Sequence, residues 1–238
     1  MLKPATPRQV RIAVDHLTEY RYDRPVSFAE HSLYLRPRES QTLHVERFAL
    51  ECEPAGKLRW VRDCFNNVVG VVGFGLAESS RLSFHARMVF AVAEENPFDF
   101  ILETRATKFP FAYDERERVA LGPFLEPDGS ERFRVLEWVR GLLGDLSQTR
   151  DTISLLAELN SAIHRTVAYE RRDDEGVQTA PETLERGAGS CRDMAELFVA
   201  ASRHLGLAAR FVSGYLFEPP PRDGSAVFNR AAGSMHAW

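Results

Sequence analysis

Residues 187–194 read Gly187-Ala188-Gly189-Ser190-Cys191-Arg192-Asp193-Met194, a glycine-rich turn that leads into a helix with periodic apolar residues. This helix is predicted to begin at or just after Cys191, to run to Leu205 and to stop at Gly206. A cysteine at a helix N-terminus lies near the positive end of the backbone dipole and near unpaired N–H groups, and both favour thiolate over thiol. Cys191 is therefore a candidate nucleophile.

A candidate base follows downstream, because His236 lies in the run Met235-His236-Ala237-Trp238 and is predicted to begin a strand. A histidine from a distant segment can pair with a cysteine nucleophile, and a third group usually orients its imidazole. Cys52 and Cys64 lie in strand or turn patterns without a helix end, so each is predicted to be a small buried hydrophobe. Position alone leaves Cys191 evenly balanced between a nucleophile and a cysteine that simply packs.

The composition of the chain is that of a soluble globular protein, with 238 residues, 44% of them hydrophobic and 27% charged. The net charge of −4 comes with no basic stripe, which argues against nucleic acid and favours a small molecule or another protein as partner. No segment approaches the ~18 apolar residues that span a bilayer, and the first residues lack an apolar signal core. Three cysteines are too few for a disulfide framework, so we expect a protein of the reducing cytoplasm. We also expect no membrane partner and no cofactor.

Residues 1–118 are predicted to form an antiparallel β-sandwich-like domain, since apolar side chains recur at every second position. The alternation is most regular over residues 82–92. Its phase changes between Val45 and Phe48, which a bulge or a strand break would absorb. Residues 63–67 resemble a hairpin turn, because paired asparagines tolerate positive φ.

Residues 119–238 are predicted to form a second domain, in which the apolar period changes to about 3.6. One helix is expected from Phe133 to Leu143, with Phe133 on its apolar face, and another from Asp151 or Thr152 to Val167. A strand is expected over residues 209–216. The predicted fold class is α+β.

Four motifs of the second domain occur in a specific order: Gly189-Ser190-Cys191-Arg192-Asp193, Leu205-Gly206-Leu207-Ala208-Ala209-Arg210, Ser213-Gly214-Tyr215 and His236-Ala237-Trp238. With them, the chain resembles the bacterial transglutaminase-like cysteine-enzyme family. The segments Tyr22–Val26 and His31–Arg38 resemble the β-rich domain that precedes the catalytic core in bacterial members, so the resemblance covers nearly the whole chain.

The resemblance implies a papain-like core in which Cys191 and His236 are two members of a Cys-His-Asp triad. In relatives, the aspartate comes from the strand after the histidine, whereas this sequence ends at Trp238. We therefore expect a core that is C-terminally incomplete, with impaired activity and an open sheet edge through which it forms homo-oligomers. Asp193 and Asp223 are poor substitutes for the missing acid, because Asp193 lies on the helix of the nucleophile and Asp223 lies in a proline-rich loop.

The predicted function is cysteine-dependent acyl transfer or hydrolysis at amide bonds of a protein or peptide, through a thioester. Protease, amidase and transferase activities all stay open. The alternative is a non-catalytic interaction module that keeps the fold, and a metal site at Cys191 and His236 is weaker, since two ligands are too few. For Arg192 and Asp193, first-turn capping and structural ion pairing are predicted instead of catalysis.

Overall fold

The computed structural model describes residues 9–93, 100–127, 132–172, 174–216 and 235–238. Its contacts divide the chain into two units, Met1–Phe100 and Ile101–Trp238, and each is described by itself. The division precedes the predicted boundary near residue 118, which falls inside helix α1 (Glu115–Leu125). The reason is that Phe109 and Phe111 already pack into the core of the second unit.

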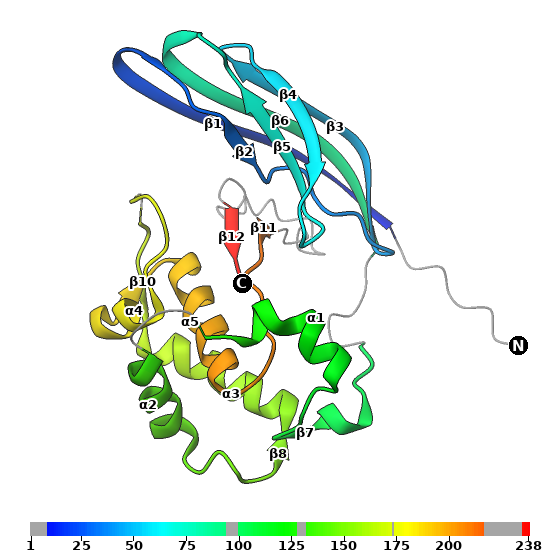
Figure 1. Cartoon of the computed structure of the whole chain (residues 1–238), viewed down its shortest axis with the longest axis vertical. Coiled ribbons are helices and arrows are strands. Elements are labelled where there is room, and N and C mark those ends of the chain that lie inside the picture. The colour runs from blue at the N-terminus through cyan, green and yellow to red at the C-terminus, as the bar shows by residue number, and fades with distance from the viewer. Residues whose placement is uncertain (1–8, 94–99, 128–131, 173, 217–234) are drawn as a thin grey trace, which may run out of the picture. The chain divides into compact units, whose positions relative to one another are not determined.

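The first unit consists of two antiparallel sheets of three strands each, in the orders β1-β6-β3 and β2-β5-β4 (Figure 1). The strands are β1 (Gln9–Ser27), β2 (His31–Leu33), β3 (Leu43–Glu53), β4 (Lys57–Arg62), β5 (Val68–Gly73) and β6 (Glu78–Ala93). Side chains of both sheets meet in one core, which confirms the predicted sandwich. The residues buried there are Phe28, Val72, Phe74, Leu82 and Phe84.

Two local features of the first unit confirm the pattern in the sequence. The pairing of β3 with β6 shifts register between Val45 and Arg47, so a bulge absorbs the change of phase. The turn that joins β4 to β5 places Asn66 at a φ of 63°, in the left-handed region that asparagine tolerates. Asp63 fastens this turn by accepting hydrogen bonds from the backbone N–H groups of Phe65 and Asn67.

The second unit is built on helices with short strands between them. Its helices are η1 (Thr104–Thr107), α1, α2 (Arg132–Leu143), α3 (Thr152–Thr166), α4 (Ala180–Arg186) and α5 (Cys191–His204). Its strands are β7 (Lys108–Phe109), β8 (Arg150–Asp151), β9 (Ala168–Tyr169), β10 (Ala188–Gly189), β11 (Ser213–Tyr215) and β12 (Met235–Ala237). The mixed content confirms the predicted α+β class.

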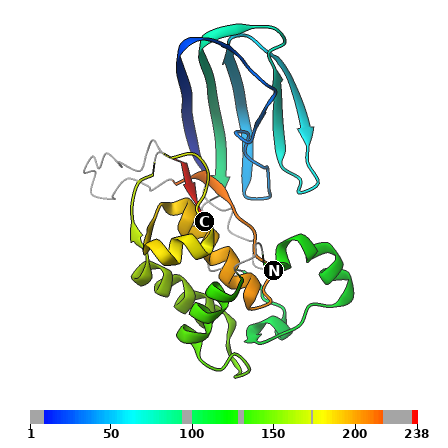
Figure 2. The ribbon, with the colours of Figure 1, turned by 60° about the vertical axis from the view of Figure 1, so that its left-hand side comes forward.

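Helix α5 is the element on which α2, α3 and α4 all pack (Figure 2). It buries one apolar face, on which Leu197 and Ala201 are fully inaccessible to solvent. Every third or fourth residue of the helix falls on that face, as the apolar period requires. The packing fixes the position of the helix start, where Cys191 lies.

Several predictions for the second unit need correction. Phe133 is 78% exposed, because α2 turns Val135 and Val139 to the core instead. The strand expected over 209–216 is shorter, at Ser213–Tyr215. Helix α1 was not predicted, although Asp114 begins it with a capping box. Asp223 and the proline-rich loop lie outside the described residues.

Within the described residues, the longest helices are too short or too polar to cross a membrane.

Candidate active site

Cys191 is the first residue of α5, as the sequence predicts, and its side chain is half-buried. Two turns of backbone bring the chain to this point. Gly187 ends α4 in the left-handed conformation, with a φ of 62°, and Ser190 is the extended N-cap residue of α5. The thiol therefore lies at a helix start, where the N–H groups of the first turn have no acceptor within the helix.

Asp193 fastens this helix start and has no exposed surface. One carboxylate oxygen accepts hydrogen bonds from the backbone N–H of Ser190, at 2.7 Å, and from its hydroxyl, at 2.8 Å. The other accepts from the Arg172 guanidinium at 2.8 Å and from the backbone N–H of Gln178 at 2.7 Å. The predicted capping and ion pairing are thus confirmed for Asp193.

The charge of Asp193 is stabilised by these donors. Burial by itself would raise the pKa of the Asp193 carboxyl, but the hydrogen bonds from Arg172, Gln178 and Ser190 outweigh it and lower the pKa below the ordinary value. The hydrogen bond between Arg172 and Asp193 also raises the pKa of the Arg172 guanidinium. The pair is therefore ionised at neutral pH.

Arg192 fastens the same helix turn to a neighbouring segment. Its guanidinium donates to the backbone carbonyl of Arg172 at 3.1 Å and to that of Asp174 at 3.3 Å. Both residues that follow Cys191 therefore bind the segment around Arg172. Arg172 carries no signal in the sequence that would have singled it out, because its partner lies on another element and the intervening residues form no regular pattern.

His236 lies on β12, which pairs in antiparallel register with β11, so that His236 is opposite Gly214. Strand β12 contacts α5, and in Figures 1 and 2 it lies beside the N-terminal end of this helix. Nε2 of His236 is buried and has no hydrogen-bond partner among the described residues, the Cys191 thiol included. The structure thus brings the two elements together.

Trp238 lies on the same face of the strand pair as His236. In an antiparallel pair, Gly214, His236 and Trp238 share one face of the ribbon. A Cβ atom at Gly214 would lie 3.4 Å from Cη2 of Trp238, so the indole covers the space that the glycine leaves. Tyr215, the next residue of β11, is half-buried, and burial raises the pKa of its hydroxyl. Neither aromatic residue is assigned a catalytic role.

The two other cysteines differ from Cys191 in their surroundings. Cys52 packs against the core of the first unit, and burial raises the pKa of its thiol. Cys64 is exposed in the turn between β4 and β5, so the prediction that it is buried is wrong. It lies in a turn that hydrogen bonds between Asp63 and Asn67 hold together, outside the core of the first unit. No group of three or more metal-ligating side chains occurs among the described residues.

Replacing Gly189 by alanine is expected to destabilise the second unit by about 1–3 kcal/mol. A Cβ atom at this position would lie 2.9 Å from Cβ of Asp193 and 3.2 Å from its Oδ2, so the capping carboxylate would have to move. The free energy of unfolding in urea measures the effect. Gly141→Ala is the matched control, because a Cβ there, within α2, meets nothing within 4 Å and should stabilise the helix. Equal stability of both variants would contradict the close approach.

Comparisons with known proteins match both parts of the chain. Residues 12–90 match the model of the bacterial transglutaminase-like N-terminal region, and residues 141–238 match that of the transglutaminase-like superfamily. Uncharacterized proteins of Mycobacterium bovis and Mycobacterium tuberculosis are 26% identical over 96% of this chain and 72% of theirs. A crystal structure from Cytophaga hutchinsonii, described as that of a "putative cysteine protease", aligns with a TM-score of 0.66 at 16% identity, over 97% of this chain and 73% of that one.

Proposed function

We propose that the chain catalyses acyl transfer from amide bonds. Two matches support this proposal, one to a bacterial transglutaminase-like N-terminal region and one to the transglutaminase-like superfamily. The second match supports a cysteine-dependent catalytic fold. Cys191 is the proposed nucleophile and His236 the proposed general base and acid. The proposed substrate is an amide group of a protein or peptide. The intermediate is a thioester on Cys191, with which a second substrate reacts.

In the first step, the Cys191 sulfur attacks the carbonyl carbon of the amide while Nε2 of His236 takes the thiol proton. The carbonyl oxygen becomes an oxyanion, and the N–H groups at the start of α5 are its proposed donors. When the C–N bond breaks, the imidazolium returns its proton to the leaving amine. The acyl group stays on sulfur as a thioester.

In the second step, His236 takes a proton from water or from an amine, which attacks the thioester carbon. The C–S bond breaks, and the imidazolium returns the proton to the displaced thiolate of Cys191. Water completes hydrolysis or deamidation, and an amine completes cross-linking. Both outcomes use the same two residues. The choice between them depends on which nucleophile reaches the thioester.

One observation carries this proposal, namely the buried Nε2 of His236 that lacks a hydrogen-bond partner among the described residues, on a strand in contact with α5. Buried ring nitrogens normally have a partner, because leaving one unpaired costs about 1–3 kcal/mol. Such cost is common at sites where a partner arrives during the reaction. The hydrogen bond between a base and its nucleophile is often long in a free enzyme and shortens when substrate binds.

Alkylation with iodoacetamide at pH 6 tests the activated thiol. We expect Cys191 to react at least about 10-fold faster than Cys52, because burial raises the pKa of the Cys52 thiol and keeps it protonated. Cys191 should also react faster than the exposed Cys64. Peptide mapping by mass spectrometry measures the three rates in one sample. His236→Gln should slow the reaction of Cys191 alone. If Cys191 reacts no faster than the other two cysteines, the proposal fails.

A further inference from the structure

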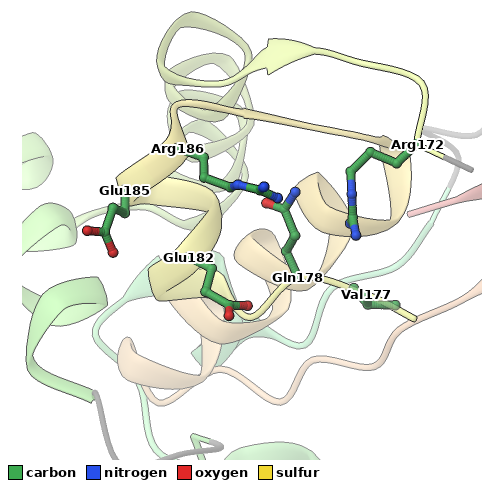
Figure 3. Close-up of a pocket in the computed structure, with 6 residues that line it drawn as sticks. All are labelled: Arg172, Val177, Gln178, Glu182, Glu185 and Arg186. Carbon is green, nitrogen blue, oxygen red and sulfur yellow. The ribbon is translucent and has the colours of Figure 1, made fainter. Parts of the chain in front are cut away.

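A cavity of about 480 Å³ lies between α4 and the segment that precedes it (Figure 3). It is lined by Arg172, Val177, Gln178, Glu182, Glu185 and Arg186. Five of these six side chains are polar or charged, and Val177 is the apolar exception. Such a lining suits a small polar group more than an apolar ligand.

Two guanidinium groups converge on one carboxamide in this cavity. Gln178 is 6% exposed, and its side chain ends between Arg172 and Arg186 (Figure 3). A guanidinium has donors and no acceptor, so the carboxamide oxygen is assigned to the side that Figure 3 draws as nitrogen. In this orientation the oxygen accepts from Arg186 Nη1 at 3.0 Å and from Arg172 Nε at 3.2 Å. Two like charges are thereby held close together by a neutral group.

Among the described residues that line the cavity, Arg186 is the cation that forms no ion pair within 4 Å, although the charge of Glu182 acts on it from farther away. Arg172 pairs with the buried carboxylate of Asp193 at 2.8 Å and with the exposed carboxylate of Asp174 at 3.6 Å. Glu185 pairs with Arg134 at 2.8 Å. Glu182 accepts hydrogen bonds from the backbone and the hydroxyl of Thr179 at the other end of α4.

Among the described residues, no carboxylate lies within ion-pair distance of Arg186, whose side chain is exposed and uses one donor on Gln178. The remaining N–H groups of its planar fork are free for an acceptor with two oxygens.

We propose that this cavity binds a carboxylate group, with Arg186 as its principal partner and Arg172 as the second cation. A planar carboxylate matches the two parallel N–H groups of a guanidinium, and it would give Arg186 the ion-pair partner that the described residues do not supply. A phosphate dianion fits less well, because its second charge would lie near the carboxylates of Glu182 and Glu185.

The cavity adjoins the helix start of the candidate active site through Arg172, which binds Asp193 directly and accepts from Arg192 through its backbone carbonyl. A bound carboxylate would therefore contact the same arginine that holds the first turn of α5. The carboxylate can come from an acidic side chain of a peptide or from a small free acid. Binding itself does not depend on the proposed chemistry of Cys191.

Titration with acetate at constant ionic strength tests the proposal, with the side-chain amide resonances of Gln178 as the reporter in nuclear magnetic resonance spectra. We expect a saturable shift with a dissociation constant on the order of 10 mM. Neutral acetamide should give no saturable shift, and inorganic phosphate should bind no tighter than acetate. A linear response to acetate, or tighter binding of phosphate, would overturn the proposal.

Arg186→Gln should weaken acetate binding at least fivefold, since it removes the unpaired charge and keeps a polar side chain. Arg165→Gln is the matched control, because Arg165 is also an exposed arginine in the last turn of a helix, α3, and its loss changes the net charge equally. Its binding should stay within twofold of the unchanged protein. Equal weakening by both variants would mean a general charge effect and would overturn the site.

Two capped tripeptides, N-acetyl-Gly-Glu-Gly-amide and N-acetyl-Gly-Gln-Gly-amide, distinguish the sources of the carboxylate. Tighter binding of the glutamate peptide than of acetate supports an acidic peptide as the ligand. Equal binding of the glutamate peptide and of acetate supports a small free acid. Binding of the glutamine peptide as tight as that of the glutamate peptide would contradict carboxylate recognition. Because none of these readouts uses catalysis, their failure is distinct from failure of the proposed acyl transfer.

Discussion

Cys191→Ser is expected to reduce acyl transfer by ~10⁴-fold or more, because a serine hydroxyl is a far weaker nucleophile than a thiolate in a site built for sulfur. An activated ester, p-nitrophenyl acetate, makes the effect measurable without knowledge of the natural substrate. The unchanged protein should release a burst of nitrophenolate equal to the concentration of enzyme and should carry an acetyl group on Cys191. The variant should show neither the burst nor the adduct at this position.

Cys64→Ser is the control for this experiment, since Cys64 is an exposed thiol that can react without a catalytic site. Its replacement should leave the burst unchanged. His236→Gln should lower the rate of acylation while it leaves Cys191 in place, which separates loss of the base from loss of the nucleophile. A full burst from Cys191→Ser, or acetylation spread equally over the three cysteines, would refute a nucleophile at position 191.

Asp193→Ala is expected to lower the free energy of unfolding of the second unit by about 3–5 kcal/mol, the cost of removing one partner of a buried ion pair. The variant leaves the guanidinium of Arg172, which is 13% exposed, without its buried charge partner. It also leaves the N–H groups of Ser190 and Gln178 without their acceptor. Urea unfolding followed by circular dichroism measures the change.

Asp174→Ala is the matched control, because Asp174 lies 3.6 Å from the same arginine but is 78% exposed. An exposed pair contributes little, so we expect a change within about 0.5 kcal/mol. Similar losses from both variants would mean that burial does not decide the strength of the pair at Arg172.

The stabilisation by Asp193 also depends on pH. Its pKa in the folded protein is lowered, so its contribution is present above the unfolded value, about 4, and is lost as the pH falls through the folded value. The difference in free energy of unfolding between the unchanged protein and Asp193→Asn should therefore be constant near neutral pH and shrink below about pH 4. A difference that stays constant into acid would contradict the ionised pair.

Strand patterns and helix starts were predictable because they depend on neighbouring residues. The phase change around Val45 predicted the bulge in β3, and the apolar period after Cys191 predicted α5. Where a local signal was ambiguous, the prediction failed. Phe133 fitted the apolar period of α2 yet is exposed, because the core selects which of two neighbouring faces is buried.

The residues of the candidate site likewise fall into two groups, those that the sequence predicted and those that it did not. Cys191, His236 and the capping role of Asp193 follow from motifs in the sequence, since each is tied to a helix start or a strand. Arg172 and the cavity beside Arg186 were not predicted, because their partners lie on other elements and no periodicity relates them. The expected lack of a triad acid in this sequence and the expected oligomer stay predictions.

The sequence by itself determined that Cys191 begins a helix, since glycine-permitted turns, the N-cap residue and the apolar period are local properties of the chain. Tertiary structure alone decided what lies around that helix start. It placed β12 against α5, gave Nε2 of His236 no hydrogen-bond partner among the described residues, and buried Asp193 against Arg172. Such contacts join residues that are far apart along the chain, and packing, not local propensity, selects them.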